Sequence, residues 1–164
     1  RLLRGRRRPG VRYRSAAALG DIPLVSVALG PDPERGEARG HARGVIAIGD
    51  TAVGLVAIGG LAAGGISLGG LAIGFASLGG VALGVLLAFG GLAVGSTAVE
   101  GAAVGRVAVG GAAVGEYACG GSALGTHVVS PVRRDPEALA FFRERGLEAL
   151  CAPAHARERD QRRR

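Results

Sequence analysis

A five-residue repeat runs through the middle of the chain and limits the folds it can adopt. From Val45 the sequence reads VIAIG, DTAVG, LVAIG, GLAAG and continues to Ser130, with one longer unit, VLLAFG, at 85–90. The third position of the unit is almost always Ala or Ser, the fourth is aliphatic, and the fifth is Gly except at Glu100 and Ser130. A second Gly follows the fifth position in alternate units, so the units pair into decads.

This period suits neither an α-helix nor a flat strand. In a helix, five residues advance the side-chain direction by about 140° beyond a full turn, so the glycines would spiral around every side. Each glycine would also cost about 1 kcal/mol relative to alanine. In a flat strand, an odd period would send equivalent residues to alternate faces. We therefore predict three extended residues and a bend in each unit, with Gly supplying the permissive backbone of the bend.

Stacking such units predicts an all-β fold, a β-solenoid (β-helix) of five-residue units that pair into decads. The aliphatic second and fourth positions are expected to fill the interior, with ten or twenty residues per coil left open. The predicted inward pairs are Ile46/Ile48, Val56/Ile58, Ile66/Leu68, Leu71/Ile73, Val81/Leu83, Leu92/Val94, Val107/Val109 and Tyr117/Cys119. The opposite phase, with Ala and Gly inside, suits only lipid or a stack of sheets, and the sequence alone does not exclude it.

Four segments are expected along the chain: a basic N-terminal tail at 1–20, a cap strand and polar loop at 21–44, the repeat at 45–130, and a capping helix with a basic tail at 131–164. The cap strand is predicted at 22–29 and the polar loop at 31–40. The helix is predicted at about 136–150, with Asp135 as N-cap and Pro136 at the first helical position. Its predicted apolar face consists of Ala138, Leu139, Phe142 and Leu150.

The repeat resembles that of pentapeptide-repeat β-helix proteins, whose coils have four sides of five residues. It departs from their usual unit, because the aliphatic residue here directly follows the small one, as in Ala52-Val53-Gly54. The whole chain resembles uncharacterised bacterial Gly/Ala-rich repeat proteins that combine a YRS segment, a PLV segment, an AIG/GG repeat and a final DPEA-x-x-FF. The matching stretches are Tyr13–Ser15, Pro23–Val25, 45–130 and Asp135–Phe142. This resemblance implies an architecture and no activity.

Charge is absent from the centre of the repeat. No ionisable side chain occurs in the 49 residues between Asp50 and Glu100, although the chain as a whole has a formal net charge of +7. The two cysteines are too few for a disulfide framework, so we expect a reducing compartment and cytoplasmic localisation, with membrane association as the alternative. We expect no secretory signal, because no compact apolar segment with a small-residue cleavage site follows the Arg-rich start.

No residue constellation predicts chemistry. The chain has no Lys for a phosphate-binding loop, and no Gly-rich window leads from a strand into a helix. The histidines His41, His127 and His155 have no Cys or carboxylate at metal-ligand spacing. Cys119 stands at an aliphatic position and is expected to be a small buried apolar residue, and Cys151 has no base near it in the sequence. We therefore expect no enzyme activity, no catalytic, cofactor-binding or metal site, no cofactor and no small-molecule substrate.

The Arg-rich start is the one candidate binding segment. Its positive charge can attract an anionic membrane or a nucleic acid without sequence specificity. The alternative is a solvated tail, and a single tyrosine is too little for a base-stacking platform. The candidate residues are Arg1, Arg4, Arg6, Arg7, Arg8, Arg12 and Arg14.

Two functions fit these features. The first is a structural or scaffold protein that forms a homo-oligomer or filament, or docks a partner, through flat Ala/Gly-rich solenoid faces that carry no charge. The second is an integral or peripheral membrane protein whose segment 51–99 lies in the bilayer, with the Arg-rich ends on the cytoplasmic side.

Overall fold

The protein is mostly β-structure with one short helix near the C-terminus. The computed structural model describes residues 10–31, 39–147 and 151, and the structural statements below concern these residues. In chain order the elements are β1 (Val11–Arg14), β2 (Ala18–Leu19), β3 (Ile22–Pro23), β4 (Val25–Leu29), β5 (His41–Val99), β6 (Ala102–Val129) and α1 (Pro136–Glu144). The chain forms two compact units, Arg1–Gly74 and Phe75–Arg164, each described by itself here.

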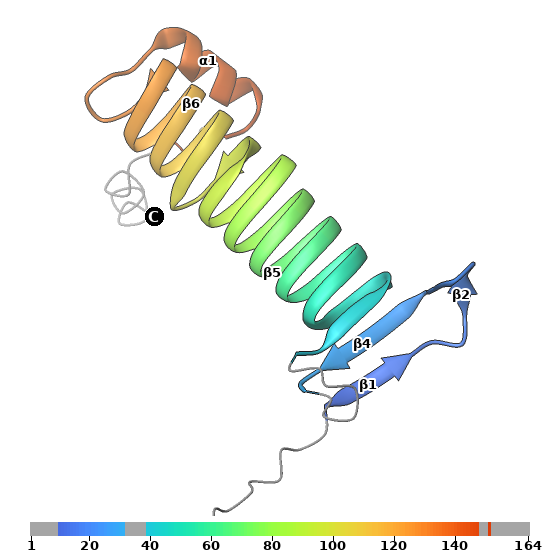
Figure 1. The fold of residues 1–164 in the computed structure, drawn as a ribbon. Helices are drawn as coiled ribbons and strands as arrows, with labels where there is room; N and C mark the ends of the chain where they lie inside the picture. The colour runs from blue at the N-terminus through green and yellow to red at the C-terminus, as the bar shows by residue number, and fades with distance from the viewer. Residues whose placement is uncertain (1–9, 32–38, 148–150, 152–164) are drawn as a thin grey trace, which may run out of the picture. The chain divides into compact units, whose positions relative to one another are not determined.

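The main sheet is mixed, has the strand order β1-β4-β5-β6, and contains two very long strands. β1 pairs with β4 in antiparallel fashion, and β4 pairs with β5 in parallel fashion. β5 and β6 are parallel, with Leu92 opposite Ala102 and Val99 opposite Val109. Segments ten residues apart are therefore neighbours in the sheet, and the ribbon of β5 and β6 winds in successive turns (Figure 1).

The core is built from alanine, which corrects the predicted inward set. In the first unit, alanines at five-residue intervals, such as Ala47, Ala52 and Ala57, pack into one cluster and are completely buried. A second cluster of the same kind runs from Ala82 to Val128. Because alanines from consecutive segments contact one another, the space between the segments accommodates little more than methyl groups. The predicted inward residues Ile46, Ile58, Ile66, Leu68, Ile73, Val81, Leu83, Leu92 and Val94 are instead exposed.

Ser67 and Ser77 replace alanine in this core. Both side chains are fully buried, and the Ser77 hydroxyl donates a hydrogen bond of 2.9 Å to the carbonyl oxygen of Leu83. A buried hydroxyl is tolerated when it has such an acceptor. Ser therefore substitutes for Ala because it is small enough and its hydroxyl finds a partner.

The repeat glycines serve close contact between neighbouring segments. A Cβ placed on Gly54 would collide with the carbonyl oxygen of Gly44, and one on Gly105 with that of Gly95. Among the described glycines, positive φ occurs only at Gly20, Gly30 and Gly146, all outside the repeat. The prediction that the repeat glycine supplies the permissive backbone of a bend is therefore wrong, because β5 and β6 are continuous strands, and the glycine instead lets the next segment approach.

Glu100 marks the break between β5 and β6. It occupies a fifth position, where Gly is usual, and has a φ of 93°. This left-handed region is unfavourable for a residue with a Cβ. The backbone N–H of Glu100 donates to the carbonyl oxygen of Val109 at 2.9 Å, so pairing continues past the break.

The N-terminal elements partly match the prediction. The strand expected at 22–29 is present as β3 and β4, interrupted at Leu24. The predicted basic tail contributes β1 and β2, and most of the predicted polar loop lies outside the described residues. β4 aligns Val25 with Ile46 and Ala28 with Gly49, and Ala28 belongs to the alanine core. β4 therefore covers the first segment of β5, as a cap strand should.

The C-terminal helix is confirmed but is shorter than expected. Asp135 is the N-cap residue, although its side chain makes no capping hydrogen bond, and Pro136 begins the helix. The helix is followed by Gly146 at a φ of +69°, a conformation typical of helix C-termini. Ala138 and Phe142 are buried, as expected, whereas Leu139 is partly exposed. Leu150 lies outside the described residues.

Candidate functional site

Among the described residues, α1 covers an outer face of the repeat where it contacts β6. Ala138 and Phe142 of the helix pack on valines at outward positions. Leu147, which follows the helix, packs against the same cluster. Val107 and Val109 were predicted to be buried in the interior, and they are buried because α1 covers them from outside. The buried members of this cluster are Val99, Val107, Val109, Cys119, Val129, Ala138 and Phe142.

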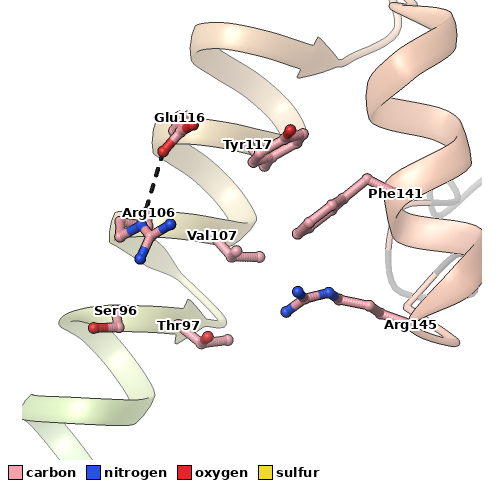
Figure 2. Close-up of a pocket in the computed structure, with 8 residues that line it drawn as sticks. All are labelled: Ser96, Thr97, Arg106, Val107, Glu116, Tyr117, Phe141 and Arg145. Carbon is pink, nitrogen blue, oxygen red and sulfur yellow. Dashed lines mark ion pairs between the residues drawn. The ribbon is translucent and has the colours of Figure 1, made fainter.

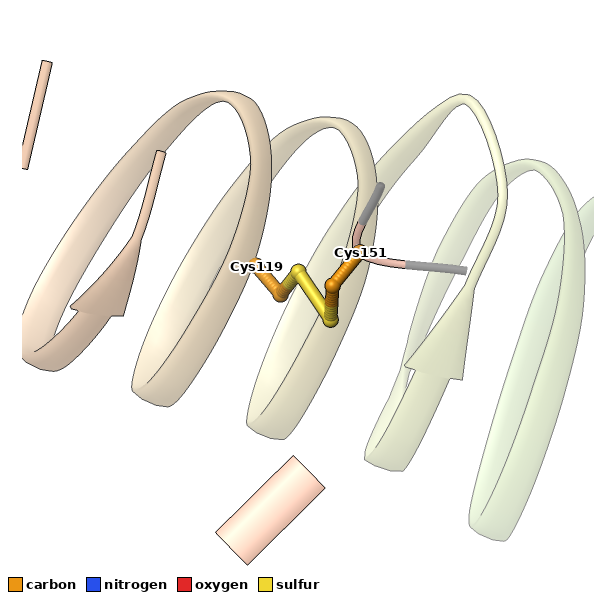
Figure 3. Close-up of a disulfide and its surroundings, with 2 residues drawn as sticks. All are labelled: Cys119 and Cys151. Carbon is orange, nitrogen blue, oxygen red and sulfur yellow. A yellow bond between two sulfur atoms is a disulfide. The ribbon is translucent and has the colours of Figure 1, made fainter. Parts of the chain in front are cut away.

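A disulfide between Cys119 and Cys151 ties the end of the chain to β6 (Figure 3). The two Cα atoms are 5.5 Å apart, within the usual range for a disulfide. Cys119 is buried at an aliphatic position, as predicted, but it is not a free thiol. The cysteine count did not predict this pairing, and neither sulfur of the pair is available as a thiolate nucleophile.

Four side chains from β6 and α1 form a continuous stack. The rings of Tyr117 and Phe141 lie 3.9 Å apart between centroids and nearly parallel, and His127 stacks against Tyr117 at 4.8 Å. The guanidinium of Arg145 lies 4.4 Å from the centroid of the Phe141 ring. Stacking and cation–π contacts of this kind favour the docked position of α1.

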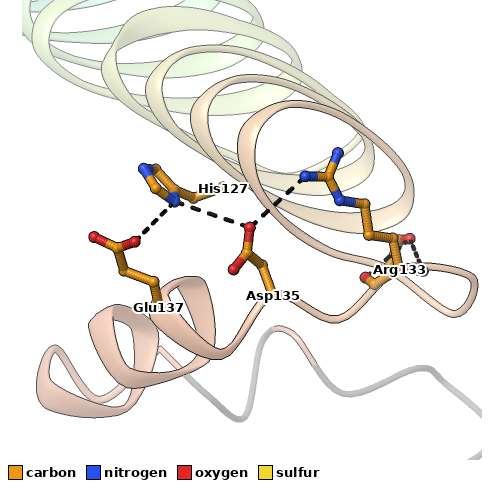
Figure 4. Close-up of polar contacts among 5 residues, drawn as sticks. His127, Arg133, Asp135 and Glu137 are labelled. Atoms are coloured by element: carbon orange, nitrogen blue, oxygen red, sulfur yellow. Dashed lines mark hydrogen bonds and ion pairs between the residues drawn. The ribbon is translucent and has the colours of Figure 1, made fainter.

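A polar cluster lies at the start of the helix (Figure 4). Nδ1 of His127 is 3.6 Å from a carboxylate oxygen of Glu137 and 3.9 Å from one of Asp135, and Nη2 of Arg133 is 3.8 Å from Asp135. Nδ1 is buried and has no hydrogen-bond partner in the structure. Asp135 therefore faces two cationic or titratable groups instead of capping the helix, which explains its missing capping bond.

Beside the stack lies a small pocket of about 160 Å³ (Figure 2). Arg145 projects into it from the helix, and Arg106 and Glu116 form a solvent-exposed ion pair of 3.8 Å on its far wall. The lining residues are Ser96, Thr97, Arg106, Val107, Glu116, Tyr117, Phe141 and Arg145. An exposed pair of this kind contributes little to stability. Among these lining residues, no nucleophile is hydrogen-bonded to a base.

Asp50 is a structural carboxylate in the first unit that the sequence analysis did not single out. Its Oδ2 accepts backbone N–H bonds from Gly40 at 2.9 Å and Gly30 at 3.0 Å. These two bonds, together with the charges of Arg12 and Arg39, lower the pKa of Asp50 below its usual value. A signal was present nonetheless, since Asp50 is the only charged residue that begins a repeat unit before Arg106.

The predicted binding residues are only partly described. Arg1, Arg4, Arg6, Arg7 and Arg8 lie outside the described residues, whereas Arg12 and Arg14 are exposed on β1. Arg12 donates a hydrogen bond of 3.3 Å to the carbonyl oxygen of Gly30.

The three histidines lie apart or outside the described part. His41 contacts the carbonyl oxygen of Arg39 at 3.0 Å, and His155 is not described. Within residues 10–31, 39–147 and 151, no group of three or more His, Cys, Asp or Glu side chains is arranged to hold a metal ion. In the same part of the chain, no helix has the length and hydropathy needed to span a membrane.

No protein-family model, curated protein or solved structure matches the chain.

Proposed function

We propose that the protein is a non-enzymatic scaffold, built as a β-solenoid of ten-residue coils, that self-associates or docks a partner through its flat outer faces. The observation that carries this proposal is the exposure of aliphatic side chains next to the buried Ala/Ser positions of the repeat. In the segment Ile66-Ser67-Leu68, for example, the serine is fully buried and both neighbours are exposed.

The solenoid part of the proposal rests on three observations. Parallel pairing occurs at a spacing of ten residues between β5 and β6. Repeat glycines contact the glycine ten residues earlier, as Gly54 contacts Gly44. Alanines five residues apart pack against each other, which is expected when two five-residue sides of one coil face each other. The resemblance to Gly/Ala-rich repeat proteins is consistent with the same architecture.

The association part rests on the chemistry of the outer faces. They carry Ile, Val and Leu, not the Ala and Gly that the sequence suggested, and in 51–99 they carry no charge. Large contiguous apolar surfaces on soluble proteins usually mark interaction sites. With alanine inside, the aliphatic rows need either another apolar surface or lipid against them.

Light scattering with size separation over a concentration series tests this proposal. We expect a mass that is a multiple of 16.3 kDa at micromolar concentration and that falls on dilution. A protein that stays monomeric over the whole series in detergent-free buffer would overturn it.

The membrane alternative is favoured by the same uncharged stretch, 51–99, with its outward aliphatic rows. Co-flotation with phosphatidylcholine vesicles at high salt would support this alternative. Flotation only with anionic vesicles and at low salt would instead indicate charge attraction by the Arg-rich ends.

The cytoplasmic localisation remains a prediction. Disulfides are rare in the cytosol, so the pairing of Cys119 with Cys151 does not favour it. Contacts of the N-terminal arginines with nucleic acid or anionic lipid likewise remain predictions, to be tested by the salt dependence of binding.

A further inference from the structure

One outer face of the first unit is a broad, continuous apolar sheet surface, called face A below. Strand alternation places its side chains opposite the buried Ser26, Ala28, Ala47, Ala57 and Ser67. Face A consists of Val11, Tyr13, Val25, Val27, Leu29, Ile46, Ile48, Val56, Ile58, Ile66 and Leu68.

The strand pairing makes face A continuous. Val11 and Tyr13 of β1 lie opposite Leu29 and Val27 of β4. In turn, Val25 and Val27 of β4 lie beside Ile46 and Ile48 of β5. The rows 56–58 and 66–68 follow at the ten-residue spacing that the glycine contacts define. Five rows of side chains therefore form one surface within the unit Arg1–Gly74.

Face A contains no charged group. The arginines of β1, Arg12 and Arg14, alternate with Val11 and Tyr13 and so lie on the other side of the strand. Two copies of face A can therefore meet without burying a charge or opposing like charges, both of which are costly. A surface that is uncharged throughout and flat is complementary to itself.

The size of face A also suits a dimer contact. Seven of its side chains are between 36% and 63% exposed. A standard interface buries about 800 Å² on each partner, and these seven side chains would form the centre of such a contact. Two sheets packed face to face, about 10 Å apart, would interdigitate these rows as in a β-sandwich.

In the second unit, a comparable apolar surface is covered by a helix. There, the outward valines Val99, Val107 and Val109 are buried under α1. Among the described residues of the first unit, no helix or strand lies over face A, and its isoleucines remain exposed.

We infer that two copies of this chain pack against each other through face A, related by a twofold axis. This inference rests on the proposed scaffold function and names the partner and the surface. A twofold contact uses the same patch on both copies, which is the commonest arrangement in homo-oligomers.

Two matched substitutions in the full chain test the inference. Ile66→Lys introduces a charge into face A, where Ile66 is 49% exposed. Ile73→Lys is the control. It introduces the same charge next to the buried Ala72, at a position that is 46% exposed and lies outside face A. Sedimentation equilibrium should show a dimer for the parent protein and for Ile73→Lys, and a dissociation constant raised by about a hundredfold or more for Ile66→Lys. Far-ultraviolet circular dichroism confirms the fold of each variant, and Tyr13→Lys on β1 replaces Ile66→Lys if that variant does not fold.

Three other outcomes would contradict the inference, and one of them would also contradict the proposed function. If Ile73→Lys disrupts the parent dimer and both face A variants leave it intact, the inference is wrong. The proposal that the protein self-associates would then stand. A parent protein that is monomeric at every concentration overturns both. A monomer that floats with phosphatidylcholine vesicles, and loses this binding in Ile66→Lys, makes lipid the occupant of face A and also overturns the inference.

Discussion

Side-chain size at single positions determines how this chain packs. The buried row of the repeat uses Ala or Ser except at Val128, whereas the exposed rows vary from Ala to Phe. Small residues are required wherever two segments touch, because interiors are packed without spare volume. The neighbouring glycines 59 and 60 allow this to be tested, since Gly59 approaches the preceding segment much more closely than Gly60 does.

Gly59→Ala should destabilise the protein, because its Cβ would collide with the backbone carbonyl of Gly49. We expect a loss of about 2 kcal/mol or more in the free energy of unfolding. Gly60→Ala is the matched control, because its nearest atom would be the Asp50 carbonyl oxygen at 3.1 Å, and it should change stability by less than about 1 kcal/mol. Urea unfolding of both variants measures the difference, and equal losses would contradict the contact assigned to Gly59.

Asp50 should make the stability of the first unit depend on pH. Its pKa is lower in the folded protein than the ordinary value of 3.8, because the carboxylate accepts bonds from Gly40 and Gly30. The stabilisation is therefore fully present above the ordinary pKa and is lost as the pH falls through the folded-state pKa.

Melting temperatures measured between about pH 6 and pH 2 test this dependence. Asp50→Asn should be less stable than the parent at neutral pH and should approach it at the acid end. Asp21→Asn, at an exposed position of the same unit, should follow the parent. If Asp50→Asn runs parallel to the parent at every pH, the carboxylate has no such role.

From the sequence, the type of each element was predicted better than which of its side chains face the interior. Extended backbone in the repeat, the strand at 22–29 and the helix start at Asp135-Pro136 were predicted and are present. The bend expected in each unit is not, because β5 is one continuous strand over His41–Val99. The phase of the repeat was wrong, because hydrophobicity alone assigns Ile and Val to the interior. The uniform size of the Ala/Ser position was the better indicator, since a narrow interior selects for size.

The α1 contact was less predictable than the helix itself. The aromatic stack and the disulfide join residues far apart in sequence, such as Tyr117 with Phe141 and Cys119 with Cys151. Neither pairing has a local sequence signature. The role of Asp50 was missed although its place in the repeat is unusual, because its partners are two backbone N–H groups whose position depends on the fold.

The disulfide should hold α1 against β6. Cys119 and Cys151 are 32 residues apart, and closing a loop of that length is worth about 3–4 kcal/mol in the chain-entropy model. Reduction should lower the stability of the parent by that order, and Cys151→Ala should have the lower stability with or without reductant. Alkylation under denaturing, non-reducing conditions should modify no thiol in the parent, and two modified cysteines would contradict the pairing.

For the chain as a whole, one arrangement explains the main features. Alanine inside gives a thin core, glycine allows segments to touch, and the aliphatic side chains are left on the outer faces. We therefore expect the exposed aliphatic rows to associate with another apolar surface, except where an N- or C-terminal element covers them. α1 does so over β6, and face A is the corresponding surface that we assign to a second copy.

Thermal unfolding of two neighbouring substitutions, Ala52→Leu and Val53→Thr, tests the inward alanine most directly. Ala52 is fully buried in the alanine cluster, whereas Val53 is 44% exposed and lies outside face A. We expect Ala52→Leu to lower the free energy of unfolding by about 3 kcal/mol or to prevent folding. Val53→Thr should leave it within about 0.5 kcal/mol of the parent value. A tolerated leucine at 52 together with a strongly destabilising threonine at 53 would contradict the inward position of alanine.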